Sequence, residues 1–320
     1  MNAFDPAALE CLAALADAGS FERAAHRLAI TQSAVSQRLR ALETGLGRLL
    51  VVRSRPLRLT EPGKLLLRYA RQMQAMRADI ARELGASSQQ DERLPIAVNA
   101  DSLATWVLPA LQPVVMAGLV EGFGLELIVD DQDFTHESLR EGTVLGCVST
   151  VADALRGCSV TPLGSMRYVA VASPGFIAQA LPQGLNRGNF AKLPWLVFNR
   201  KDDNHAVWVC QAFGVQEPRL VERHVPSTEA QTRAAVMGWG LAVVPEPMAA
   251  PGLANGTLHP LHPHVHVDVC LHWHQWKLRS GSGADGDGTV PADSPLRAGA
   301  LDRVGRALAD GARATLRPAG

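Results

Sequence analysis

Residues 20–43 read SFERAAHRLAITQSAVSQRLRALE, and this stretch decides the fold of the N-terminal part of the chain. It predicts two amphipathic helices on either side of a tight polar turn, with Ser20 and Thr31 as their N-caps. The second helix carries small and polar side chains on one face and branched aliphatic side chains on another. This layout predicts a helix-turn-helix, which places one helix in the major groove of DNA.

The residues around this stretch extend the motif. A helix is predicted over residues 7–18, and Gly19 ends it. In the helix that begins after Thr31, four aliphatic residues recur at helical spacing and are predicted to face the core: Val35, Leu39, Leu42 and Leu46. Residues 49–59 predict a short hairpin, which is a candidate wing with Arg53, Arg55 and Arg58 on it.

The predicted DNA contacts come from this helix and from the wing. Five polar residues lie on the other faces of the helix and are free to meet DNA: Gln32, Ser33, Ser36, Gln37 and Arg40. Glutamine suits adenine and arginine suits guanine, while Thr31 and Ser36 can reach phosphates beside the helix N-terminus. Arg53 and Arg55 would contact phosphate or enter the minor groove. The alternative is an ordinary solvated helix, which a pattern spanning three helices and a wing disfavours.

A long helix is predicted from Thr60 to about Leu84. Its apolar residues alternate in steps of three and four: Leu66, Tyr69, Met73, Met76 and Ile80. This spacing is typical of a coiled-coil seam and predicts a dimer. The alternative is an amphipathic helix packed on its own body. The hydrophilic segment ASSQQDER that follows favours the dimer.

Charge is unevenly distributed along the 320 residues, although the formal net charge is zero. Residues 1–86 hold 13 Lys and Arg against 8 Asp and Glu, a balance of +5. The remainder holds 18 against 23, a balance of −5. A basic N-terminal end on an acidic body suits contact with nucleic acid at one end of the molecule.

Composition indicates a soluble cytoplasmic protein. No apolar run reaches the roughly 20 residues that span a bilayer, and the N-terminus lacks the basic segment of a signal peptide. The five cysteines form no CxxC pair, which indicates a reducing compartment. We therefore expect no membrane association.

From Leu94 onward, predicted strands alternate with predicted helices. This alternation predicts an α/β domain with largely parallel sheets. At roughly 220 residues the domain is large enough to divide into two lobes. The Gly-, Asp- and Ser-rich segment 279–295 is predicted to be a mobile insertion, and a last helix is predicted over 297–313.

The stretch FERAAHRLAITQSAVSQRLRALETGLGRLLVVRSRPLRLTEPG resembles the winged helix-turn-helix signature of the LysR-type transcriptional regulators almost throughout. AVNADSLATWVLPAL (97–111) is similar to their ArgP/IciA branch, the lysine- and arginine-responsive regulators related to LysG. Similarity continues through DDQDFTHESLREGTVLGCVS, NRKDDNHA and PSTEA. The resemblance covers about residues 5–275, with the His-rich stretch 259–274 and the Gly/Asp-rich insertion departing from it.

This resemblance implies a domain order and a set of partners. It implies a winged helix-turn-helix over 1–60, a dimerising linker helix over 61–92, and an effector-binding regulatory domain over 93–320. The two lobes of that domain would resemble periplasmic binding proteins and hold a small effector between them. The implied partners are double-stranded DNA, RNA polymerase and further copies of the chain, in a homodimer or homotetramer. The implied role is activation of genes such as a basic amino-acid exporter, without a cofactor.

The effector site is predicted at the carboxyl ends of the strands, where ligands collect in α/β sheets. Ser102 and Thr228 are predicted to begin helices, so that their hydroxyls, Ser227 and free N–H groups would bind a carboxylate. Five acids supply negative charge for ammonium or guanidinium groups: Asp130, Asp131, Asp133, Asp202 and Asp203. Lysine or arginine fits both features. The alternative is that these residues are caps and solvated turns.

Other functions have less support. His264 and His266, like His272 and His274, have metal-like spacing on a candidate strand, but strand and loop histidines are the favoured interpretation and we predict no metal. An α/β hydrolase would need a motif such as GxSxG, HExxH or a P-loop, which the sequence lacks. A solute-binding protein would not carry a DNA-binding motif. We therefore predict an effector-responsive transcription factor and no enzyme, with a different small effector as the alternative.

Overall fold

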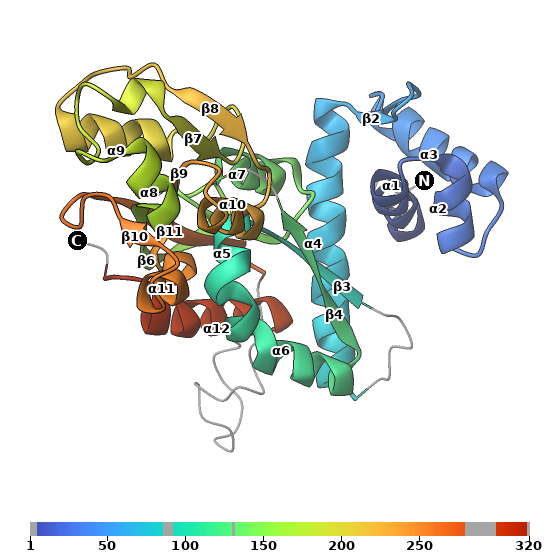
Figure 1. The fold of residues 1–320 in the computed structure, drawn as a ribbon. Coiled ribbons are helices and arrows are strands. Elements are labelled where there is room, and N and C mark those ends of the chain that lie inside the picture. Colours follow the sequence, from blue (N-terminus) through green and yellow to red (C-terminus); the bar gives the residue numbers. More distant parts are fainter. Residues whose placement is uncertain (1–4, 86–91, 130–131, 279–298, 319–320) are drawn as a thin grey trace.

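The computed structural model describes residues 5–85, 92–129, 132–278 and 299–318. The N-terminal helices lie at one end of the molecule and an α/β body at the other, with one long helix standing between them (Figure 1). This arrangement gives three parts whose contacts determine the candidate sites.

The N-terminal part, which we call the head (residues 5–59), has helices α1 (Pro6–Ala18), α2 (Phe21–Arg27) and α3 (Gln32–Leu46). Both predicted N-caps are confirmed: Ser20 Oγ accepts a hydrogen bond from the Arg23 N–H, and Thr31 Oγ1 accepts one from the Ala34 N–H. Strands β1 (Val51–Val52) and β2 (Arg58–Leu59) pair antiparallel and form the predicted hairpin. Three of the four aliphatic residues predicted to face the core are buried: Val35, Leu39 and Leu42.

Helix α4 (Glu61–Glu83) belongs to two hydrophobic cores at once. Thr60 caps it by accepting a hydrogen bond from the Gly63 N–H. In its first turns Leu66 and Ala70 are buried with the head, whereas Ala75 is buried with the body. The helix therefore packs against both the head and the body and connects them.

The predicted seam on α4 is divided between these cores and solvent. Leu66 is 7% exposed, so the head itself covers this member of the seam. Tyr69, Met73 and Ile80 are 52%, 40% and 52% exposed. Leu65, which is 48% exposed, extends this apolar stripe toward the head.

One mixed sheet forms the body, in the order β4-β3-β5-β11-β6-β9-β7-β8, with β10 paired to β6. The strands are β3 (Glu92–Val98), β4 (Phe123–Val129), β5 (Gly146–Ser149), β6 (Cys158–Ala172), β7 (Pro194–Val197), β8 (Val221–His224), β9 (Leu241–Pro245), β10 (His259–Pro260) and β11 (His266–Trp276). Strands β3, β4 and β5 are parallel, as are β7, β8 and β9. The prediction of largely parallel sheets is wrong at the centre, where the two longest strands, β6 and β11, pair antiparallel.

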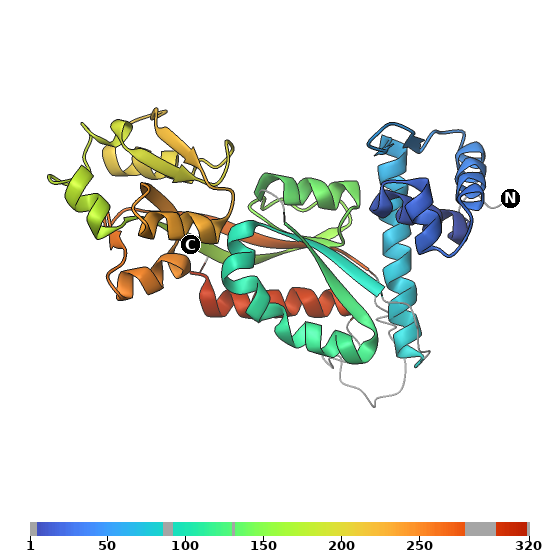
Figure 2. The same ribbon diagram turned by 45° about the vertical axis from the view of Figure 1, so that its right-hand side comes forward.

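Two lobes lie on either side of this central pair (Figure 2). Lobe I holds β3–β5 with α5 (Ala100–Ser102), the π-helical turn η1 (Leu103–Val107), α6 (Leu108–Glu121), α7 (Gln132–Glu141) and α12 (Ala300–Thr315). Lobe II holds β7–β10 with α8 (Pro174–Ala180), η2 (Phe190–Lys192), α9 (Asn204–Phe213), α10 (Thr228–Val236) and α11 (Glu246–Ala254). In lobe I, α7 covers one face of the sheet, and α6 and α12 lie on the other. The predicted insertion 279–295 lies outside the described residues.

The helical stretch Ala100–Glu121 has the length and apolar composition of a membrane span, which differs from the prediction that no apolar run of the sequence is long enough. It begins at the end of β3, and its α6 part packs against α12. Five apolar side chains on α6 are exposed: Leu108, Val115, Met116, Leu119 and Val120. Exposed apolar patches of this kind commonly mark interaction sites.

The contact between α4 and the head can be tested at Gly63. A Cβ at this position would lie 2.1 Å from the Leu50 carbonyl oxygen, which is backbone and has little room to move. Gly63→Ala should lower the free energy of unfolding by about 1–3 kcal/mol, the usual cost of overpacking, in denaturant unfolding followed by circular dichroism. The control is Gly175→Ala in α8, whose Cβ meets no atom within 4 Å and should be neutral or stabilising. Equal stability of the two variants would contradict this packing.

Candidate functional site

The predicted DNA-contacting residues share an exposed face of the head. Six of them are exposed: Thr31, Gln32, Ser33, Gln37, Arg40 and Arg55. Arg53, also exposed, follows β1 and reaches back toward α3, with Nη2 3.4 Å from Ser36 Oγ. Its guanidinium lies 5.0 Å from the ring centroid of Phe21. The wing and the N-terminal half of α3 therefore present one continuous polar and cationic surface.

The wing is held to α3 by a half-buried carboxylate. Glu43 Oε1 accepts hydrogen bonds from the backbone N–H groups of Leu50 and Val51, at 2.8 and 3.3 Å. Because both donors lie where the hairpin begins, this contact fixes the wing relative to α3. The first turn of α3 contains no acid, so its free N–H groups favour an approaching phosphate.

A cavity of about 330 Å³ opens between the lobes at the carboxyl ends of β3 and β7. Asn99 and Asp101 line it from lobe I, and Asp202 and Asp203 line it from lobe II. Its volume is at the lower end of the range for small-molecule sites, about 300–1,000 Å³. This position agrees with the rule that ligands bind at the carboxyl ends of strands in α/β sheets.

Asp101 connects the two lobes across this cavity, and we did not predict it as a site residue. Its Oδ1 accepts a hydrogen bond from the Thr228 hydroxyl of α10 at 2.6 Å, and its Oδ2 accepts one from the Tyr168 hydroxyl of β6 at 2.5 Å. Burial raises the pKa of the Asp101 carboxyl above its usual range, against the opposing effect of these two hydroxyl donors. The group is therefore an acceptor whose negative charge is incompletely stabilised.

Ser102 does not begin a helix, which corrects the sequence prediction. The helix begins at Ala100, with Asn99 at the N-cap position. Ser102 is therefore buried inside the helix and does not line the cavity. Neither Asn99 Oδ1 nor Ser102 Oγ has a hydrogen-bond partner within the described part of the chain.

The lobe II residues lie closer to their predicted positions. Thr228 begins α10, and Ser227 caps that helix by accepting a hydrogen bond from the Ala230 N–H at 3.3 Å. Asp202 orders its own loop, because its carboxylate accepts from the backbone N–H groups of Phe198 and Asn204. Asp130 and Asp131 lie outside the described residues. Asp133 lies on α7, and its side chain is not described.

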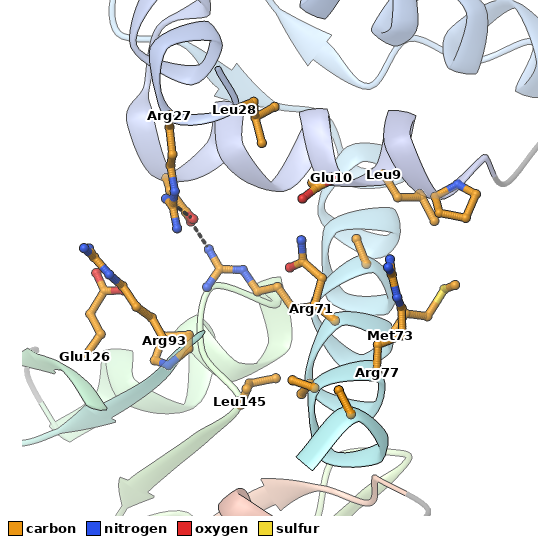
Figure 3. Close-up of a pocket in the computed structure, with 18 residues that line it drawn as sticks. Leu9, Glu10, Arg27, Leu28, Arg71, Met73, Arg77, Arg93, Glu126 and Leu145 are labelled. Atoms are coloured by element: carbon orange, nitrogen blue, oxygen red, sulfur yellow. Dashed lines mark hydrogen bonds and ion pairs between the residues drawn. The ribbon is translucent and has the colours of Figure 1, made fainter. Parts of the chain in front are cut away.

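A larger cavity, of about 580 Å³, lies between the head, α4 and lobe I (Figure 3). Four arginines line it, among them Arg27 and Arg71, which meet at the carboxylate of Asp17. Three acids, Glu10, Asp17 and Glu126, line the same cavity, so its charges nearly cancel, whereas the cleft between the lobes is lined by three aspartates and one lysine. The cleft between the lobes is therefore the better site for such a ligand.

The histidines form no metal site in the described part of the chain, where no group of three or more His, Cys, Asp or Glu side chains is arranged to hold an ion. His272 and His274 lie on β11 with ring centroids 6.4 Å apart, and His136 packs on His274 at 5.2 Å. Burial lowers the pKa of His136 and His274. These rings are part of the packing between α7 and the sheet.

The fold and these sites define a class of protein, a DNA-binding regulator whose body holds a small molecule. Two family models match the chain: "Bacterial regulatory helix-turn-helix protein, lysR family" over residues 6–64, and "LysR substrate binding domain" over residues 87–281. The regulator ArgP of Aeromonas salmonicida is 40% identical over 282 residues, which cover 88% of this chain and 93% of that protein. The chain belongs to the LysR family of transcriptional regulators, so the hydrolase alternative is set aside.

Two solved structures are similar over nearly the whole chain. ArgP from Mycobacterium tuberculosis has a TM-score of 0.77 and 38% identity, covering 97% of this chain and 98% of that one. Full-length LysG from Corynebacterium glutamicum with bound effector Arg has a TM-score of 0.72 and 35% identity, covering 98% of this chain and 100% of that one.

Two arginines of the head should contribute differently to DNA binding. Arg40→Ala should weaken binding to a selected duplex and relax its sequence preference, since an arginine that contacts a base contributes about 1–3 kcal/mol of discrimination. Arg53→Ala should weaken binding to all duplexes and reduce the salt slope by about one. Anisotropy titrations with the selected and a scrambled duplex at several salt concentrations measure both effects. Arg313→Ala, on the distant helix α12, is the control. If Arg40→Ala bound both duplexes as wild type does, Arg40 would not be a base-contacting residue.

Proposed function

We propose that this regulator binds arginine or lysine in the cleft between its lobes and that occupancy of the cleft changes how the head engages DNA. The observation that carries the proposal is the lining of the cleft. Asn99 Oδ1 and the Asp101 carboxylate are acceptors on lobe I, and Asp202 and Asp203 face them from lobe II. Ammonium and guanidinium groups only donate hydrogen bonds, so they complement such a lining.

The carboxylate of the amino acid has a complementary place in the same cleft. Lys201 is the one cationic side chain in the lining among the described residues. The first turn of α10, which starts at Thr228 and is capped by Ser227, offers backbone N–H groups with the positive end of a helix dipole. Ser102 does not line the cleft, but we keep it in the proposal as a residue behind the lining, because its buried Oγ has no hydrogen-bond partner among the described residues.

The similar LysG structure supports the choice of ligand. That protein was solved with bound effector Arg, and it matches this chain over its whole length. Closure of the two lobes around the ligand would change the bridge between Asp101 and Thr228. Only a difference in ligand affinity between the open and closed forms can drive such a change.

Asp101→Asn should weaken arginine binding by roughly 30-fold, or about 2 kcal/mol, since it removes one member of a buried charge pair. Titration calorimetry on the full chain measures this loss. Asp203→Asn in the same lining is the control, with a smaller expected effect. If wild type and Asp101→Asn bound arginine and lysine with equal affinity, Asp101 would not belong to the site. If wild type gave no heat of binding with either amino acid, the effector would be a different molecule.

The pH dependence of binding should follow the raised pKa of Asp101. Arginine pairs with the ionised carboxylate, and the unliganded carboxyl keeps its proton to a higher pH than an exposed aspartate, whose pKa is about 3.9. Affinity should therefore rise as the pH increases above about 4, with release of a proton on binding. Calorimetry in two buffers of different ionisation enthalpy detects that proton, and Asp101→Asn should abolish its release.

We also propose that the chain self-associates through the exposed apolar residues of α4. We propose a cytoplasmic location, with RNA polymerase as a further partner of the DNA-bound form. Tyr69, Met73 and Ile80 form an exposed stripe at coiled-coil spacing. A second self-association surface would complete a tetramer. Lobe I exposes apolar residues on α6 and on the edge strand β4. Lobe II exposes Val221 on the opposite edge strand, β8, and Val236, Met237 and Trp239 at the end of α10.

Met73→Glu combined with Ile80→Glu should weaken self-association at least about tenfold, or ~1.4 kcal/mol. Sedimentation velocity over a concentration series would show the shift to smaller species. The control is Gln74→Glu, which adds a charge at an exposed neighbouring position of α4. An unchanged distribution in the double variant would place the dimer contact elsewhere.

A further inference from the structure

Arg71 joins three parts of the chain in one contact. It lies on α4, and its Nη2 forms an ion pair with Asp17 of α1 in the head. Its Nη1 donates a hydrogen bond to the Thr143 carbonyl oxygen of lobe I at 2.5 Å. The side chain is only 13% exposed. We call Asp17, Arg71 and Thr143 the Arg71 junction.

The ion pair at this junction is sheltered, and a second cation from the head shares it. Arg27 of α2 reaches the other oxygen of Asp17 at 2.7 Å, but its side chain is 47% exposed. Arg27 and Arg71 extend toward each other across the gap between head and α4 (Figure 3). Burial lowers the pKa of Arg71 and Asp17 raises it, so this guanidinium depends on the carboxylate for compensation.

The lobe I side of the junction is the end of α7, which rests directly on α4. Glu141 forms an ion pair with Lys64, and Arg68 Nη1 lies 3.5 Å from the Arg140 carbonyl oxygen. Gly142 approaches so closely that a Cβ there would lie 2.5 Å from Arg68 Cα. With φ at +76° this turn favours glycine. The end of α7 is therefore packed too closely on α4 to shift along it freely.

The first half of α7 packs against strands that lead into the effector cleft. α7 starts three residues after Val129, which pairs with Val98 at the end of β3, and Asn99 of the cleft follows Val98. Thr135 in the first half of α7 donates a hydrogen bond to the Val148 carbonyl oxygen at 2.8 Å. The strand that carries Val148 leads on to Thr150 in the cleft lining. A helix of this length spans about 15 Å.

We propose that α7 and the Arg71 junction carry the coupling between the effector cleft and the head within a single subunit. This inference rests on the proposed function for the identity of the ligand. A movement of lobe I on binding shifts α7 against α4, which strengthens or weakens the contact from Thr143 through Arg71 to Asp17. By linkage, DNA binding at the head must act on the same contact in return.

The first experiment uses DNA alone and does not depend on any amino acid. The amides of Gly142 and Thr143 are hydrogen-bonded to the carbonyl oxygens of Leu139 and Ser138, so hydrogen exchange reports on this turn. In the wild-type chain a bound duplex should change exchange at these amides. In Arg71→Gln and Asp17→Asn the change should be lost. An equal change in wild type and both variants, or none in wild type, would overturn the inference.

The second experiment measures the factor by which arginine changes DNA affinity, for which about 5- to 150-fold is typical of allosteric coupling. This factor should fall toward one in both variants. Arg71→Gln removes a positive charge and Asp17→Asn removes a negative one, so their basal DNA affinities should shift in opposite directions while both lose coupling. A merely electrostatic effect on DNA would not produce that pattern. A wild-type factor clearly different from one that both variants retain would overturn the inference.

Matched controls separate the junction from general effects of charge. Arg27→Gln removes the exposed partner of the same carboxylate and should retain most of the coupling. Arg313→Gln breaks an exposed pair on α12 and should retain all of it. If arginine has no effect on wild type while DNA still alters exchange at Gly142 through Arg71, the proposed ligand is wrong and the junction stands.

Discussion

The body depends on the antiparallel pairing of β6 with β11. These two strands pair over the whole length of β11, from His266 opposite Val169 to Trp276 opposite Cys158. Each lobe attaches its own parallel strands to one side of the pair, β5 to β11 and β9 to β6. The cleft lies where the lobes meet, and Tyr168 of β6 reaches Asp101 there. A register shift between Leu271 and His272 interrupts the ladder, and such irregularities are places where strands bend.

Local signals made the head predictable from the sequence. Ser20, Thr31 and Thr60 are N-caps because a hydroxyl satisfies a free N–H two or three residues away, and this chemistry needs no distant partner. The hairpin and the buried face of α3 follow from spacing in the same way. In the body, the order of strands and helices was predictable, but strand direction was not. The pairing of β6 with β11 joins residues about a hundred positions apart, and no local pattern specifies it.

Prediction from the sequence was limited in the same way for individual residues of the cleft. Asn99 and Ser102 are both good N-cap residues, and a helix start two residues earlier than predicted placed Ser102 inside the fold. An aspartate in the first turn of a helix is also normal because it complements the helix dipole. Asp101 therefore carried no distinctive signal. Its importance comes from Thr228 and Tyr168, which only the folded chain brings to it.

The double membership of α4 explains why coupling within one subunit is physically reasonable. Leu66 and Ala70 are buried with the head and Ala75 with the body, so rotating one part against the other would expose apolar surface on the same helix. Close-packed interfaces of this kind favour discrete arrangements over continuous sliding. Polar contacts such as those of Arg71 contribute less energy than this burial, but they are directional and can select between two arrangements of similar energy. A sheltered arginine with one partner in the head and another beside α7 is well placed to make that selection.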